Sequence, residues 1–154
     1  MKRDSRLSGV LHIVLHMARQ DGPVTSEMLA RQMDTNPVVI RRIMAGLRER
    51  GYVRSEKGRG GGWTLACDLS TVTLRDIYAA LGNPSLLAIG NRTESPGCLL
   101  EQAVNSALGQ AFQDAEALLL SRLGEVTLAM LGADVSRRLR AHGGSRKLED
   151  IHAA

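Results

Sequence analysis

The chain has 154 residues, a formal net charge of +4 at pH 7, and few aromatic residues among abundant Leu and Ala. This composition favours helices over a large sheet, and the basic balance implies an anionic partner. Two cysteines are too few for the disulfide framework of a secreted protein. No apolar run approaches the roughly 18 residues that span a bilayer, so we expect no membrane partner. His12 interrupts the apolar segment 10–14, so no hydrophobic region of a signal peptide is visible and we expect a cytoplasmic location.

The charge is distributed unevenly along the chain. Residues 1–66 hold twelve Lys and Arg against six Asp and Glu, a net of +6. Residues 67–154 hold eight against ten, a net of −2, and the two parts sum to +4. Nucleic acid would therefore bind to the first part of the chain.

Two helices are predicted before residue 36. Apolar residues recur at helical spacing over residues 5–19, and the predicted buried face comprises Leu7, Val10, Leu11, Val14, Leu15 and Ala18. Thr25 can cap a second helix over residues 26–33, with a buried face of Met28, Leu29 and Met33. The short turn at residues 34–35 then leads into a third helix, which is typical of a helix-turn-helix.

The third helix carries the clearest pattern. Asn36 can cap it and Pro37 fits its first turn, while Gly51 fits a left-handed C-terminal cap. At one hundred degrees per residue, the apolar side comprises Ile40, Ile43, Met44 and Leu47. The opposite side comprises Val38, Arg42 and Ala45, with Arg41 at its flank. Two adjacent arginines are often only a solvated helix face, but here a turn and a hairpin accompany them.

A basic hairpin follows, with strands predicted over residues 52–56 and 63–66 and a glycine-rich tip over residues 57–62. Arg59 at the tip could enter a minor groove. A phosphate-binding loop would need a Lys-Ser/Thr pair or a complete G-x-G-x-x-G opening a helix, and a strand-like segment follows instead. Trp63 is interpreted as an apolar plug of the hairpin. The pattern predicts a mainly α protein with a winged helix-turn-helix domain, a two-stranded β-wing and a long C-terminal dimerisation helix.

The predicted DNA contacts are Thr35, Asn36, Pro37, Val38, Arg41, Arg42, Lys57 and Arg59. Arginines can meet phosphates or the acceptor edge of guanine, and Val38 can contact a thymine methyl group. Nothing in the chain resembles a catalytic constellation such as G-x-S-x-G, so no enzyme is predicted.

The second half of the chain is predicted to mediate assembly. The predicted organisation is a winged helix-turn-helix domain at 1–82, a loop at 83–97, dimerisation helices at 98–141 and a polar, flexible tail at 142–154. A short helix is expected at 74–81, and Thr127 can cap a last helix over 128–139. The long helix, 98–123, carries a stripe of small and apolar residues: Leu100, Val104, Ala107, Leu108, Ala111, Ala115, Leu118 and Leu119.

The stripe has two interpretations. It can pair with a second copy of the chain, giving a homodimer, or it can pack on its own DNA-binding domain. We favour the homodimer, on the expectation that residues 1–66 already bury a small core by themselves.

Four segments together resemble the Rrf2 family of bacterial transcriptional regulators, nearest to its YwnA-like branch. They are Asn-Pro-Val-Val-Ile-Arg-Arg, Leu-Arg-Glu-Arg-Gly-Tyr-Val, Gly-Arg-Gly-Gly-Gly-Trp-Thr-Leu and Leu-Arg-Asp-Ile-Tyr-Ala-Ala-Leu. The resemblance covers residues 5 to about 131. It implies a homodimer with crossed long helices and two winged domains on a pseudo-palindromic double-stranded DNA operator. It also implies groove contacts by Val38, Arg41 and Arg42, and a minor-groove contact by Arg59.

The sensor region departs from the cluster-binding members of that family, which carry three cysteines there. Residues 82–100 contain only Cys98, a poor cage for an iron–sulfur cluster that takes four ligands, so we predict no cofactor. Cys98 is instead a redox candidate, because the positive end of a helix dipole stabilises a thiolate. Cys67 is interpreted as structural or incidental. His12 and His16 stand one turn apart, but no nearby ligand completes a metal set, so core-edge or surface histidines are favoured.

The sequence thus predicts a DNA-binding transcriptional regulator, a homodimeric repressor that could respond to redox state through Cys98. Two alternatives stay open: a cluster-dependent sensor, and a winged-helix interaction module without specific DNA binding.

Overall fold

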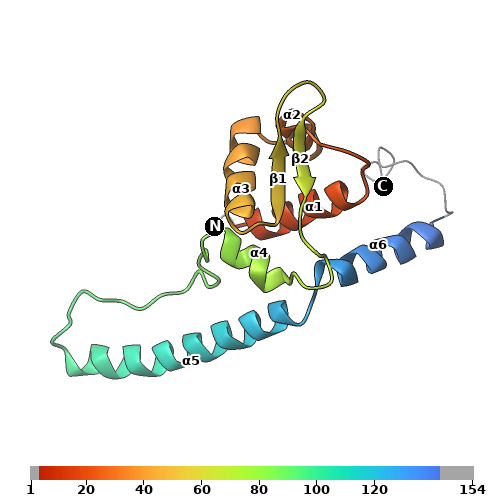
Figure 1. Cartoon of the computed structure of the whole chain (residues 1–154). Coiled ribbons are helices and arrows are strands. Elements are labelled where there is room, and N and C mark those ends of the chain that lie inside the picture. Colours follow the sequence, from red (N-terminus) through yellow and green to blue (C-terminus); the bar gives the residue numbers. More distant parts are fainter. Residues whose placement is uncertain (1–3, 143–154) are drawn as a thin grey trace.

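The computed structural model describes residues 4–142, so the predicted tail lies outside the described residues except for His142. Its elements, in chain order, are α1 (Arg6–Ala18), α2 (Ser26–Gln32), α3 (Pro37–Glu49), β1 (Val53–Glu56), β2 (Gly62–Leu65), α4 (Leu74–Ala80), α5 (Leu99–Gly124) and α6 (Leu128–Ala141). Figure 1 shows α1 to α4 and the hairpin gathered on one side and α5 extending away from them. We call residues 4–81 the head and α5 the arm. The predicted mainly α fold, with a two-stranded hairpin and a long C-terminal helix, is confirmed.

The helix starts follow the predicted caps. The Thr25 hydroxyl accepts a hydrogen bond from the Met28 amide at 3.2 Å, and the Asn36 side chain accepts one from the Val38 amide at 2.8 Å. Thr127 does the same for the Met130 amide at 3.2 Å. Each bond satisfies an amide that has no partner within its own helix.

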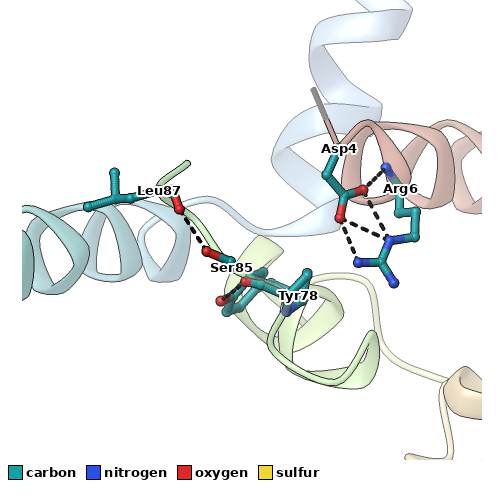
Figure 2. A network of polar contacts seen from close by, with 6 residues as sticks. Asp4, Arg6, Tyr78, Ser85 and Leu87 are labelled. Carbon is teal, nitrogen blue, oxygen red and sulfur yellow. Dashed lines mark hydrogen bonds and ion pairs between the residues drawn. The ribbon is translucent and has the colours of Figure 1, made fainter. Parts of the chain in front are cut away.

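At the start of α1, the cap is provided by a side chain that precedes the N-cap residue. Ser5 makes no side-chain cap bond, and the Asp4 carboxylate accepts a hydrogen bond from the Arg6 amide at 3.0 Å. Figure 2 shows the Arg6 guanidinium on the same carboxylate. The hydrogen bonds from Arg6 lower the pKa of Asp4 to about 2, so this exposed cap is ionised at neutral pH.

The head is built around a single apolar core, to which α1, α2, α3 and β1 all contribute. The core also includes Val72, Ile77 and Leu128, and the last two are fully buried. The core therefore extends beyond residues 1–66, whose ability to bury a small core by themselves stays a prediction. Side chains from α4 and from the first turn of α6 complete the core of the head.

Two predicted buried positions are corrected. Ala18 is exposed, whereas Ile13 and Met17 of α1 are buried. Met28 is 38% exposed, and its neighbour Ala30 is buried instead. α1 has apolar residues on most sides, and α2 spans only seven residues, so periodicity alone leaves the buried face of each helix undetermined.

The arm is organised differently from the head. In the structure of residues 4–142, none of the 26 residues of α5 is buried. Leu100 is 79% exposed, Val104 56% and Leu118 60%, and Ala107, Ala111 and Ala115 are exposed as well. The alternative that the stripe packs on its own head is therefore wrong.

Beyond the arm, the chain returns to the head. The Leu74 amide donates to the Val126 carbonyl at 3.0 Å, and the Leu128 amide donates to the Val72 carbonyl at 2.9 Å. The Ala129 amide donates to the Leu69 carbonyl at 2.8 Å. These bonds join the segment between α5 and α6 to the segment before α4, so the C-terminal end of the arm is held on the head.

The loop between α4 and α5 is anchored near both of its ends. Near α4, the Tyr78 hydroxyl donates to the Pro84 carbonyl at 2.5 Å, and the Ser85 hydroxyl donates to the Leu87 carbonyl at 2.8 Å (Figure 2). Near α5, the Asn105 side chain donates to the Arg92 carbonyl at 2.6 Å.

Within residues 4–142, every helix is either too short or too polar to cross a bilayer.

Candidate nucleic-acid interface

Helix α3 presents two contrasting sides. Ile40, Met44 and Leu47 are fully buried, as predicted, and fix the helix against the core. Val38 is 57% exposed on the opposite side, and Arg42 is also exposed. The first turn, with Thr35 and Asn36 exposed beside Pro37, lies on the same solvent-facing part of the helix-turn-helix. This arrangement could insert the N-terminal half of α3 into a major groove.

Arg41 has a partner that sequence analysis missed. Its Nη2 atom lies 2.5 Å from Oε1 of Glu27, in the first turn of α2. The two residues stand fourteen positions apart, and only the packing of α2 against α3 brings them together. No periodicity rule could have found this pair.

The wing begins where α3 ends. Gly51 has φ of +75°, the left-handed geometry predicted for the helix cap, and turns the chain into β1. β1 and β2 pair antiparallel in a register that sets Val53 opposite Leu65 and Glu56 opposite Gly62. Lys57 and Arg59 are exposed on the tip between the strands, as the predicted groove contact requires.

A second connection missed by sequence analysis fixes the wing to the helix-turn-helix. The Val24 amide donates to the Trp63 carbonyl at 3.0 Å, and the Trp63 amide donates to the Val24 carbonyl at 2.8 Å. The Trp63 indole N–H donates to the Ser26 hydroxyl at 2.9 Å. Gly62 allows this approach, because a Cβ there would stand 2.6 Å from the Val24 carbonyl oxygen. Trp63 is partly buried against the core, so its interpretation as an apolar plug is confirmed and its tethering bond is added.

The residues at the start of α5 bear on the cofactor question. Cys98 is exposed and precedes α5 without a side-chain cap bond. The polar groups around it bond to one another: the Glu101 carboxylate accepts from the Ser95 amide at 3.2 Å, and the Gln102 side chain donates to the Pro96 carbonyl at 2.8 Å. One thiol beside groups that already bond to each other does not fit a cluster with four ligands.

The other cysteine and the two histidines lie elsewhere. Cys67 is partly buried after β2, and burial raises the pKa of its thiol, which disfavours the reactive thiolate. The Nε2 atoms of His12 and His16 lie 2.8 Å apart, and His16 is 5% exposed. Among residues 4–142, no three His, Cys, Asp or Glu side chains converge in a way that could hold a metal ion.

These elements define a winged helix-turn-helix protein. It comprises a short α2, a helix α3 with one exposed side, and a glycine-tipped hairpin that is hydrogen-bonded back to α2.

Comparisons with known proteins agree with this class. The profile of the Rrf2 family, described as iron-dependent transcriptional regulators, matches residues 3–134. YwnA of Bacillus subtilis, classed as an HTH-type transcriptional regulator, is 27% identical over 125 residues, which cover 81% of this chain and 92% of YwnA. A crystal structure classed as a transcriptional regulator, from Lactobacillus plantarum, superposes with a TM-score of 0.71 at 26% identity, covering 92% of this chain and 99% of that one. IscR of T. potens shares the fold, with a TM-score of 0.63 at 20% identity and coverage of 90% of each chain.

The chain belongs to the Rrf2 family of DNA-binding transcriptional regulators. This family consists of regulators and not of enzymes, which agrees with the sequence analysis.

Proposed function

We propose that the protein is a cytoplasmic, homodimeric repressor that binds a specific double-stranded DNA operator. In each chain α3 enters a major groove with Val38, Arg41 and Arg42, while Arg59 reaches the adjacent minor groove and Thr35, Asn36, Pro37 and Lys57 contact the backbone. The observation that carries the proposal is the division of α3 into a fully buried side and an exposed basic side. The tether between Trp63 and Ser26 supports it, because it fixes the wing relative to α3.

The exposed stripe of α5 supports the homodimer. An apolar surface of this extent is normally covered by a partner, and a second copy of the same helix offers a self-complementary one. The alanines of the stripe allow two helix axes to approach closely. Two heads related by a two-fold axis would meet the two half-sites of a pseudo-palindromic operator.

The test begins with selection of duplexes by the full-length protein from a random library of double-stranded DNA. We expect an enriched pseudo-palindrome, whose affinity falls steeply with salt concentration because neutralised phosphates release counterions. Arg42→Ala and Arg59→Ala should each weaken binding about tenfold, the effect of one lost groove contact. The matched control is Arg137→Ala, an exposed arginine of α6 whose loss removes the same charge.

Equal affinities for wild type, Arg42→Ala and Arg59→Ala would remove α3 and the wing from the mechanism. Failure to enrich any sequence would favour the alternative of a protein-interaction module. The repressor assignment is tested separately: deletion of the gene should raise transcription from a promoter that contains the selected site, and lowered transcription would indicate an activator.

A second candidate property is a response to oxidants through Cys98, and the exposure of this thiol beside the arm favours it. Hydrogen peroxide should then weaken operator binding by wild type and leave Cys98→Ser unaffected. Equal sensitivity of the two proteins would exclude Cys98 as the sensor. Anaerobically purified protein should lack the absorption near 400 nm that a cluster would give, and such absorption would support the cluster-dependent alternative.

A further inference from the structure

The ion pair between Glu27 and Arg41 lies on the proposed DNA-binding surface. Both side chains are about half exposed, at 50% and 55%. An exposed ion pair contributes little to folding stability, because solvent screens it and both side chains lose rotamer freedom. The ion pair therefore matters through its effect on the position and charge of Arg41.

The contact restricts a flexible side chain. The Glu27 carboxylate accepts a hydrogen bond from one terminal nitrogen of Arg41, at 2.5 Å. A guanidinium carries five N–H donors in a rigid planar fork, so one bond restricts the orientation of the group and leaves other donors for a ligand. The carboxylate also offsets the positive charge of Arg41, which reduces its attraction to a phosphate.

Arg42, the next residue, provides a contrast. It has no ion-pair partner among residues 4–142, and its side chain is exposed. Arg42 keeps its full charge on a flexible stem, so within the major groove it can reach a phosphate at the groove edge as well as a base, whereas the restrained guanidinium of Arg41 suits the paired acceptors of a guanine edge. The two adjacent arginines therefore differ in how freely they can reorient on a duplex.

We propose that Glu27 is a specificity-determining residue, which positions Arg41 for a base edge and prevents it from neutralising a backbone phosphate. The inference rests on the proposed function, because it presumes that α3 enters the major groove. In this proposal Glu27 acts on the DNA through Arg41, which it contacts, so its role is one of positioning.

The test compares wild type with Glu27→Gln, using the selected operator duplex and poly(dI-dC) as a non-specific duplex. Glu27→Gln should bind poly(dI-dC) more tightly, and the slope of log affinity against log salt should steepen by about 0.9, the value for one additional neutralised phosphate. The ratio of operator to non-specific affinity should fall about tenfold. The thermal midpoint should stay within a degree or two of wild type, because the ion pair is exposed.

Two controls separate positioning from a general charge effect. Glu49→Gln removes the same charge at the exposed C-terminal end of α3 and should change neither the salt slope nor the affinity ratio. In an Arg41→Ala background, Glu27→Gln should also leave the ratio unchanged, because the residue to be positioned is gone.

The inference is overturned if Glu27→Gln keeps the wild-type affinity ratio, or if it lowers that ratio equally with and without Arg41. Either result leaves the proposed function intact, because wild type still discriminates the operator. If wild type itself does not discriminate, the proposed function fails and this inference fails with it.

Discussion

The head and the arm contain similar apolar residues but place them in opposite environments. In the head, Ile40, Met44 and Leu47 occur at helical spacing and are fully buried. In the arm, Leu100, Val104 and Leu118 occur at comparable spacing and are more than half exposed. The difference lies in the tertiary contacts: α3 packs on α2, β1 and α4, whereas the stripe stays exposed on a helix that extends away from the head (Figure 1). Apolar periodicity thus identifies a surface that needs covering but not which chain covers it.

The largest expected effect tests the arm. Replacing Val104 and Leu118 together by Asp introduces charges into the exposed stripe, which a paired helix would have to bury without compensation. We expect sedimentation to change from two chains to one. Operator affinity should fall about a hundredfold or more, because the second head loses the effective concentration that linkage supplies.

The matched control for this variant is Ser106→Asp with Gln113→Asp, two exposed positions on the other side of α5. It adds the same charge and should remain dimeric. Circular dichroism should show a folded head in both variants. A control that dissociates equally, or a wild-type protein that is already monomeric, would assign the stripe to something other than pairing.

The second prediction tests whether the head needs the chain beyond the arm. Leu128→Ala removes a fully buried side chain and should lower the free energy of unfolding by about 2–5 kcal/mol, measured by urea denaturation at fixed protein concentration. Met130→Ala, two residues further along α6 and 53% exposed, is the control and should cost well under half as much. Similar losses for the two variants would mean that α6 does not complete the core.

The third prediction concerns the tether inside the head. Trp63→Phe removes the indole N–H that donates to Ser26, and should lower the free energy of unfolding by about 1–3 kcal/mol, since the change also reduces packing. Operator affinity should fall several-fold, because the wing carrying Arg59 is less firmly held. In an Arg59→Ala background the affinity loss should shrink, and an undiminished loss would show that the tether does not act through the wing.

The smallest expected effect is a difference in alkylation rate between the two thiols, Cys67 in the head and Cys98 at the start of the arm. Burial raises the pKa of the Cys67 thiol in the head. At pH 8 a smaller fraction of Cys67 is therefore thiolate in the folded protein than in an unfolded chain, and this thiolate fraction grows as the pH rises. Iodoacetamide should therefore modify exposed Cys98 first, with Cys67 following more slowly and accelerating towards pH 10. Mass spectrometry of timed samples measures both rates, and faster modification of Cys67 would contradict its burial in the head.

Local chemistry made the boundaries of several helices predictable from sequence. Asn36, Thr25 and Thr127 cap their helices because each side chain bonds an amide two or three residues away. Gly51 ends α3 because it adopts a positive φ without steric cost.

Long-range packing decided what the sequence could not show. The pairs Glu27–Arg41 and Ser26–Trp63 join residues fourteen and thirty-seven positions apart, and Leu128 reaches a core whose first residues lie more than a hundred positions earlier. The predicted faces of α1 and α2 were partly wrong at Ala18 and Met28, because neighbouring elements set the rotation of these helices.

The sequence alone determined where the helices and the hairpin form and which side of α3 faces solvent, because hydrogen bonds and side-chain periodicity act within a few residues. Only the tertiary structure decided how the wing is fixed to α2, what holds Arg41, and that the stripe of the arm stays exposed among residues 4–142. These features depend on contacts between distant segments, and such contacts exist only once the core has brought those segments together.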